Sequence, residues 1–306
     1  MGRTARVWNM RVAILGCGYV GLELGRRLTA AGHEVVGVRR SEAGAAAIER
    51  AGFDAIRADV TDAEALTAVP AVDTVVYAAS AGERGVEPAR TVYVTGLQTA
   101  IDHFGGRDEP PSRFVYTSST GVYGDHEGAW VDETTPLDPE TERERVLVEA
   151  ERLALSRPAE YGIDGSVVRF AGLYGPDRYR IERYLTGPVT EGYLNVIHRD
   201  DAAGTVAYLL EHDLGRDEVV LAVDDEPVSR WTFADWLADE CGVERPSKVT
   251  KTDWETRTDE ETDASRRLRA DKRCSNAKLR ELGYDLTYPT FREGYRESIG
   301  AYRAGE

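Results

Sequence analysis

Residues 11–21 read RVAILGCGYVG, and this stretch is the strongest indication of the fold. Residues 11–15 form a short apolar run typical of a buried strand, and glycines follow at positions 16, 18 and 21. The first glycine permits a tight turn, the second lets a pyrophosphate approach the backbone, and the third allows close packing of helix on strand. A helix that opens here offers N–H groups and a positive dipole end to that phosphate. The stretch predicts dinucleotide binding, and a tight structural turn is the alternative.

Strands and helices alternate after this stretch. Apolar runs predict further strands at 34–38, 54–58, 74–78, 113–117, 166–170 and 219–223. Helical spacing predicts helices at 21–31, 43–51, 64–69, 92–104 and 141–156. This alternation implies right-handed crossovers, so we expect an α/β fold with a doubly wound parallel sheet, the Rossmann fold.

The remaining chain predicts a smaller α/β substrate-binding domain. We expect the Rossmann domain to be discontinuous, formed by residues 10–175 and 195–225. The substrate-binding domain would then comprise residues 176–194 and 226–306. Residues 244–275 are dense in charge and weakly apolar, which predicts a surface excursion or a partly mobile arm.

The composition narrows the classes of function. The chain has 306 residues with 54 acidic and 38 basic side chains, a formal net charge of −16. A negative surface repels phosphate backbones, which disfavours nucleic acid as a partner. Only four of the basic residues are lysines. An acidic, arginine-rich chain is typical of a halophilic cytoplasm, and a GC-rich genome is the alternative explanation.

Cysteine usage and hydropathy predict a cytoplasmic protein. The cysteines Cys17, Cys241 and Cys274 are far apart and form no CxxC or Cys/His cluster. No stretch reaches the roughly 18 apolar residues of a membrane helix, and the N-terminus lacks the apolar core of a signal peptide. We therefore expect no disulfide framework, no metal site and no membrane partner.

The second predicted strand ends at Arg39 and Arg40, where NAD-binding proteins usually place an acidic residue for the ribose hydroxyls. An arginine here can pair with the 2′-phosphate of NADP through charge-assisted hydrogen bonds. We therefore expect NADP as the cofactor, with NAD as the second option. Two solvated charges in a loop are the structural alternative.

Several motifs resemble the extended short-chain dehydrogenases, the NAD(P)-dependent epimerase/dehydratase superfamily. Residues 113–124, RFVYTSSTGVYG, are similar to the fifth strand and active-site loop of that family. Residues 169–176, RFAGLYGP, and 197–203, IHRDDAA, are similar to two of its later segments. The resemblance implies that cofactor contacts come from Gly16, Cys17, Gly18, Tyr19, Val20, Gly21, Arg39, Arg40, Asp59, Val60, Ala78, Ala79 and Ser80. Asp59 would be the acid that contacts adenine.

The chain departs from the family at its catalytic pair. Family members carry Tyr-x-x-x-Lys on the helix after the serine loop, and the tyrosine exchanges a proton while the nicotinamide exchanges hydride. Thr141 stands at the tyrosine position and Arg145 at the lysine position. Threonine offers no phenolate and arginine stays charged. The glycine loop is also one residue shorter than the family's G-x-x-G-x-x-G, and these departures resemble the atypical extended members.

Four residues are left as catalytic candidates. Ser119 matches the substrate-binding serine or threonine of the family, and its hydroxyl could hydrogen-bond a substrate oxygen. Tyr123 is the nearest phenol that could replace the lost acid, or it forms a wall of the pocket. Thr141 and Arg145 complete the set, and Arg145 either stands near the nicotinamide ribose or is an exposed charge.

Two further features are weaker candidates. His198 is either a general base or, more often in this motif, a residue that orients the backbone. A basic and aromatic group either faces a phosphate or carboxylate of the substrate or supplies counter-charges on an acidic surface. Its members are Arg169, Tyr174, Arg178, Arg180 and Arg183.

These observations leave two functional hypotheses. The first is an NAD(P)-dependent oxidoreductase or epimerase that acts on a hydroxylated small molecule, free or nucleotide-linked. The second is a non-catalytic NADP(H)-binding redox sensor or scaffold, because Thr141 and Arg145 replace the usual pair. Family members commonly dimerise through helices equivalent to 92–104 and 141–156. The second of these is heavily charged here, which leaves homodimer and monomer both open.

Overall fold

A seven-stranded sheet forms the centre of the first part of the chain. The computed structural model describes residues 9–83, 85–257 and 270–305. The strand order is β12-β7-β5-β4-β1-β2-β3. The strands are β1 Arg11–Leu15, β2 Glu34–Arg39, β3 Asp54–Arg57, β4 Thr74–Tyr77, β5 Arg113–Ser119, β7 Asp164–Phe170 and β12 Val219–Ala222.

The strand order reverses next to β1, because β1 lies between β2 and β4. It pairs in parallel with both, with Val12 opposite Val35 on one side and Thr74 on the other. Strands β2 and β3 are parallel, as are β4 and β5. In a doubly wound sheet a ligand binds outside the carboxyl ends of the strands at such a reversal. The predicted fold class is confirmed, and it places a cleft beyond the ends of β1 and β4.

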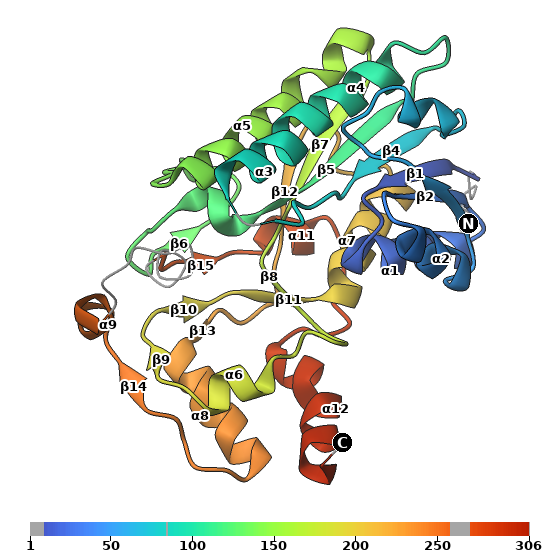
Figure 1. Ribbon diagram of the computed structural model, residues 1–306. Helices are drawn as coiled ribbons and strands as arrows, with labels where there is room; N and C mark the ends of the chain where they lie inside the picture. The colour runs from blue at the N-terminus through green and yellow to red at the C-terminus, as the bar shows by residue number, and fades with distance from the viewer. Residues whose placement is uncertain (1–8, 84, 258–269, 306) are drawn as a thin grey trace, which may run out of the picture. The chain divides into compact units, whose positions relative to one another are not determined.

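Helices connect these strands and cover both faces of the sheet (Figure 1). The helices are α1 Tyr19–Ala30, α2 Glu42–Arg50, α3 Val86–Arg90, α4 Leu97–Gly105, α5 Glu142–Ser156 and α7 Arg199–Glu211. Shorter turns are η1 Ala65–Ala68, η2 Thr91–Gly96 and η4 Pro158–Tyr161. Helices α3, α4 and α5 lie along one face, and α1 and α2 lie along the other.

Alternation along the strands builds the core between sheet and helices. Successive side chains of a strand point to opposite faces. Leu15 of β1 pairs with Tyr77 of β4, so their side chains lie on the same face of the sheet. Both belong to the cluster formed with Leu97 and Phe104 of α4. All four are 0% exposed. Full burial of a large apolar side chain contributes about 1.5–3 kcal/mol, so this face anchors the ends of β1 and β4.

The chain divides into two compact units whose segments alternate in sequence. Unit 1 contains the sheet and runs to Ser119, then over Thr141–Arg169 and Ala203–Val220. Unit 2 comprises Thr120–Glu140, Phe170–Ala202 and the chain from Leu221 onward. The assignment of cofactor binding to 10–175 and 195–225, and of substrate binding to the rest, stays a prediction.

Unit 2 consists of short strands and several helices. Its strands are β6 Trp130–Val131, β8 Gly172–Tyr174, β9 Val189–Thr190, β10 Tyr193–Leu194, β11 Val196–His198, β13 Val228–Ser229, β14 Lys248–Val249 and β15 Arg273–Cys274. Its helices are α6 Ile181–Leu185, α8 Arg230–Cys241, α9 Lys251–Arg257, α11 Ala277–Glu281 and α12 Phe291–Ala304, with a turn η3 at Thr120–Tyr123. Aromatic residues of α8 and α12 pack together, as Phe233 does on Phe291 with ring centroids 5.1 Å apart.

Two predicted helices differ from the structure. The helix expected at 92–104 begins at Val86 and contains a π-helical turn over Thr91–Gly96. The helix expected at 64–69 is a short 3-10 turn, Ala65–Ala68. Strands β14 and β15 and helix α9 lie within the range 244–275 that the sequence predicts as an excursion, and residues 258–269 of that range lie outside the described residues. No helix in the described ranges is long and apolar enough to cross a membrane.

Candidate functional site

The glycine loop after β1 is shaped by a close approach of two backbone segments. Gly16 has φ +78°, and its N–H donates to the carbonyl oxygen of Val38 at 3.1 Å. A Cβ atom on Gly16 would lie 2.2 Å from the Cα atom of Ala79, which follows β4. Two features therefore require glycine at position 16, namely the left-handed backbone and the close contact between the ends of β1 and β4.

Helix α1 begins directly after this loop. Gly18 is its N-cap residue, and no acidic residue stands in the first turn to offset the positive end of the helix dipole. A Cβ atom on Gly21 would lie 3.0 Å from a methyl carbon of Ile14, so the third glycine brings the helix close to the strand. Together these features form the close strand–turn–helix junction at which the sequence predicts anion binding.

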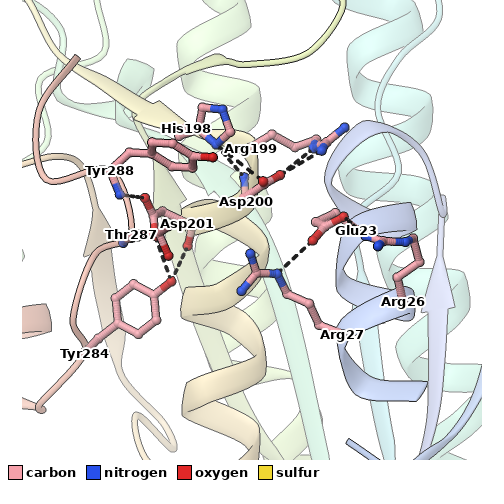
Figure 2. A network of polar contacts seen from close by, with 10 residues as sticks. All are labelled: Glu23, Arg26, Arg27, His198, Arg199, Asp200, Asp201, Tyr284, Thr287 and Tyr288. Atoms are coloured by element: carbon pink, nitrogen blue, oxygen red, sulfur yellow. Dashed lines mark hydrogen bonds and ion pairs between the residues drawn. The ribbon is translucent and has the colours of Figure 1, made fainter. Parts of the chain in front are cut away.

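One turn further along, Glu23 holds two arginines of the same helix (Figure 2). Its carboxylate pairs with Arg26 at 2.5 Å and with the Nε atom of Arg27 at 2.9 Å. Glu23 is buried, and pairs at this helical spacing stabilise the helix by a few tenths of a kcal/mol each, about 0.2–0.5.

Arg39 lies over the glycine loop. Its terminal nitrogen is 2.7 Å from where a Cβ atom of Gly18 would stand, and its Nε atom is 2.8 Å from the equivalent point on Gly44. The guanidinium thus lies between the glycine loop and the start of α2. Arg40 is 79% exposed and stands 3.7 Å from Asp59. Two cations therefore border the place where the backbone leaves room for a phosphate.

Asp59 is a charged acceptor at the end of β3. One carboxylate oxygen accepts hydrogen bonds from the backbone N–H and the hydroxyl of Thr61, at 3.0 and 2.7 Å. Burial raises the pKa of Asp59, but these two bonds and the charge of Arg40 outweigh it, so the pKa lies below its ordinary value. The carboxylate is ionised at neutral pH and can accept a hydrogen bond from a ligand.

These residues line one cleft in unit 1, with a volume of about 250 Å³. Seven predicted cofactor residues line it, namely Gly16, Arg39, Arg40, Asp59, Val60, Ala79 and Ser80. The other six predicted residues, Cys17, Gly18, Tyr19, Val20, Gly21 and Ala78, belong to the adjoining loop, the first turn of α1 and the end of β4. Glycines at the points of closest approach, two arginines and an ionised acceptor fit a dinucleotide.

Cys17 has no reactive character in this loop. Its side chain is 1% exposed, and burial raises the pKa of the thiol to about 12. The thiolate, which is the reactive form, is therefore absent at neutral pH. Its sulfur lies close to Gly21 of α1 and Gly37 of β2, so Cys17 fills space between helix and strand.

The structure gives Ser119 and Tyr123 different surroundings. Ser119 is the last residue of β5 and is partly exposed. Tyr123 is 0% exposed, and its hydroxyl donates a hydrogen bond of 2.7 Å to the backbone carbonyl of Asp132. A phenol committed to this bond is poorly placed to transfer a proton to a substrate. The geometry favours the interpretation of Tyr123 as a packing residue.

Thr141 and Arg145 both make local contacts at the start of α5. The Thr141 hydroxyl accepts from the N–H of Glu144 at 3.1 Å, while the Glu144 carboxylate accepts from the N–H of Thr141 at 2.9 Å. This reciprocal pair is a capping box. Arg145 forms an ion pair with Glu142 and its side chain is 50% exposed. Their catalytic roles stay predictions, and these contacts supply a structural role for each.

The members of the predicted basic and aromatic group have different surroundings in the structure. Arg169 is buried and pairs with Glu151 through both carboxylate oxygens, at 2.7 and 3.0 Å, so it does not face a substrate. Tyr174 is 2% exposed and stacks on Tyr295. Arg178 and Arg180 line a groove together with acidic residues, which is the arrangement expected of counter-charges. Arg183 is exposed on α6.

His198 and its neighbours in unit 2 hold the backbone. The Nδ1 atom of His198, which is 1% exposed, accepts from the N–H of Asp200 at 3.2 Å. Asp201 accepts from the N–H groups of Thr287 and Tyr288, both at 2.8 Å, and from the hydroxyl of Tyr284 (Figure 2). The segment therefore fastens the chain before α12 to the start of α7, which agrees with the backbone-orienting interpretation of His198.

The family follows from a sequence match over the sheet. A model of the NAD dependent epimerase/dehydratase family matches residues 12–219, which is more than half of the chain. The chain belongs to this family. The match includes the glycine loop and the strands that border the cleft, and the resemblance predicted from the sequence motifs is confirmed.

Relatives of this family member match most of its length. Protein YeeZ of Escherichia coli strain K12 is 30% identical over 286 residues, which is 91% of this chain and 96% of YeeZ. A solved structure of a candidate NAD-dependent epimerase/dehydratase from Methylobacillus flagellatus is 32% identical, with a TM-score of 0.77 and coverage of 97% and 100% of the two chains. UDP-glucose 4-epimerase from Thermotoga maritima, solved with UDP-glucose, has a TM-score of 0.78 and coverage of 97% and 99%, but 18% identity, and it shows the fold alone.

Sequence reasoning missed some residues of the cleft in this family member. Ser41, Gly82 and Val92 also line it. Ser41 caps α2 by accepting from the N–H of Gly44 at 3.1 Å, and a serine just before a helical run is a signal that could have found it. Val92 had no such signal, because its position depends on the π-helical turn.

Proposed function

We propose that this family member binds NADP(H) in the cleft of unit 1 and acts as an oxidoreductase or epimerase on a hydroxylated small molecule, free or nucleotide-linked. The observation that carries the proposal is the placement of Arg39 and Arg40 on the same cleft as Gly16 and Asp59. NAD(H) is the second cofactor option, because the family as a whole is NAD-dependent.

Charge and geometry support NADP(H) at this cleft. The glycine loop and the start of α1 would hold the pyrophosphate, and the ionised Asp59 would accept from the adenine. Arg39 lies between the glycine loop and Gly44, and Arg40 is mostly exposed at the cleft. A hydrogen bond to a charged group contributes about 1.5–3 kcal/mol, so one such contact to a 2′-phosphate suffices for a tenfold preference.

The substrate contact in this proposal is Ser119. It ends β5, the strand next to β4, and thus stands at the carboxyl edge of the sheet to which the cleft belongs. Its hydroxyl would donate to an oxygen of the substrate and hold it in place. A bound nicotinamide would supply hydride exchange. An acid other than the family's tyrosine is needed, since Thr141 has no acidic hydroxyl.

Titration calorimetry tests the cofactor proposal. We expect the wild type to bind NADPH at least tenfold more tightly than NADH. Replacing both arginines (Arg39→Ala with Arg40→Ala) should remove this preference while NADH affinity stays within about threefold. Arg50→Ala is the matched control, because Arg50 is an exposed arginine at the end of α2 whose Nε atom donates to the carbonyl of Ala46 in the same helix, and it does not line the cleft. Equal affinity of the wild type for the two dinucleotides would contradict the proposal.

A non-catalytic NADP(H)-binding sensor or scaffold is the second candidate. It is favoured by the local bonds that engage the hydroxyls of Tyr123 and Thr141 and the charge of Arg145. The two candidates differ in whether NADPH is consumed. Absorbance of NADPH is followed with a panel of sugars, ketones and quinones. Consumption that requires the folded protein supports the enzyme, and binding without consumption across the panel supports the sensor.

A further inference from the structure

The helix after β4 contains a π-helical turn with a visible cause. The hydroxyl of Tyr77, at the end of β4, donates to the backbone carbonyl of Val92 at 2.6 Å. In an α-helix that carbonyl would accept from the N–H of Gly96. A Cβ atom on Gly96 would lie 2.7 Å from the Tyr77 hydroxyl, so glycine makes room for the inserted group. A side chain that enters the helical ladder widens it locally, and here the widened turn is Thr91–Gly96.

Tyr77 is held firmly enough to impose this turn. Its side chain is 0% exposed, and its ring packs on Phe114 and Tyr116 of β5 with centroids 6.5 and 6.2 Å apart. Burial raises the pKa of its phenol well above the ordinary value, so the hydroxyl keeps its proton and remains a donor to the carbonyl of Val92.

The turn carries two residues to the cleft. Val92 lines the cleft directly. The next residue, Tyr93, accepts a hydrogen bond through its hydroxyl from the backbone N–H of Ala81 at 3.3 Å. Ala81 stands between Ser80 and Gly82, both of which line the cleft. Tyr93 is thus a tie between the helix and the loop that follows β4.

The strand order assigns this loop to one half of the cleft. Arg39 ends β2, Arg40 follows it and Asp59 follows β3. Residues 79–82 follow β4, on the other side of β1 and its glycine loop. A dinucleotide whose pyrophosphate lies at the glycine loop would place its adenosine half toward β2 and β3. Its other half would then extend toward the loop after β4.

We propose that Tyr93 is a positioning residue that holds the loop at residues 79–82 against the nicotinamide half of the dinucleotide. The proposal rests on the proposed function, namely that the cleft binds a dinucleotide. In this proposal the π-helical turn places Tyr93 against the loop, because Tyr77 and Gly96 fix the conformation of the turn. The adenosine half is held by other residues and does not depend on this tie.

Two ligands and two phenylalanine variants test the proposal by calorimetry. NADPH spans both halves of the cleft, whereas adenosine 2′,5′-bisphosphate spans only the adenosine half. Tyr93→Phe removes one hydrogen bond, so we expect NADPH to bind about three- to tenfold more weakly. The bisphosphate should bind within twofold of its wild-type affinity. Tyr161→Phe is the matched control, because that hydroxyl donates to Asp102 at 3.1 Å in the same unit and does not line the cleft.

The outcomes separate this proposal from the proposed function. An unchanged NADPH affinity in Tyr93→Phe, equal to that of Tyr161→Phe, would overturn the role of Tyr93. An equal loss for NADPH and the bisphosphate would also overturn it, because Tyr93 would then support the whole cleft. If the wild type binds neither NADPH nor NADH nor the bisphosphate, the proposed function itself fails. A selective loss for NADPH, with thermal unfolding unchanged, supports the proposal.

Discussion

The proposed cofactor cleft and the start of α5 differ in how the structure arranges the residues that the sequence singles out. At the cleft, residues that are far apart in sequence, such as Gly16, Arg39 and Asp59, line one space. At the start of α5, Thr141 and Arg145, which the sequence predicts at the positions of the family's catalytic pair, bond to Glu144 and Glu142 of the same helix. The first region has the properties of a binding site, and the second has those of a well-capped helix.

The difference lies in what each region requires of its residues. At Gly16 the cleft leaves no room for a side chain and needs a left-handed backbone. Glycine alone meets both conditions without strain. A catalytic pair requires two particular functional groups, and substitution of either removes the chemistry. The shape of the cleft therefore does not depend on which functional groups stand at the start of α5. Variants in both regions test this difference.

The largest effect is expected from Gly16→Ala. The added methyl carbon would lie 2.2 Å from the Cα atom of Ala79, so the ends of β1 and β4 would have to separate. We expect NADPH affinity to fall by about 100-fold or more, because a loop displaced by even an ångström loses its contacts to the pyrophosphate. Calorimetry on the purified variant measures this loss.

Gly32→Ala is the control for Gly16→Ala. Gly32 also has a positive φ, +92°, but a Cβ atom there would meet nothing within 4 Å. It should lose about 1–2 kcal/mol of unfolding free energy from backbone strain and keep its NADPH affinity. If both variants lose affinity equally, the close approach at Ala79 is not what shapes the loop.

The glycine loop could be predicted because its requirements are local. The turn, the helix start and the packing of Gly21 on Ile14 all lie within eleven residues, and the motif encodes them directly. The π-helical turn could not be predicted, since it depends on the hydroxyl of Tyr77, which is fifteen residues from Val92. The bond between Tyr123 and Asp132 likewise depends on a loop conformation that no residue pattern specifies.

Thr141 is an instructive intermediate case. The sequence TERE at 141–144 carries the threonine and glutamate of a capping box, so its structural role was readable. The resemblance to the family predicts a catalytic position at the same residue. The local pattern was the more direct guide to the contacts that the side chain makes.

A smaller effect is expected from Tyr123→Phe. Loss of the buried hydroxyl leaves the carbonyl of Asp132 without its donor, so we expect the unfolding free energy to fall by about 1–3 kcal/mol. NADPH affinity should not change. Any turnover should also stay within a few-fold of the wild type, measured with the best substrate of the panel. A fall in turnover of about 100-fold at unchanged stability would instead identify Tyr123 as the substitute acid.

The smallest effect is expected from Thr141→Val, which removes the cap of α5 without changing the shape of the side chain. Loss of an N-cap costs about 0.5–2 kcal/mol, measured as the free energy of unfolding in urea. Thr290→Val is the matched control, because Thr290 and Glu293 form the same capping box at the start of α12. Both variants should lose similar stability and keep NADPH affinity, and Thr141→Ser, which retains the hydroxyl, should resemble the wild type. If Thr141→Val alone lost turnover while its stability loss matched that of Thr290→Val, the start of α5 would be part of the active site, and the contrast between the two regions would fail.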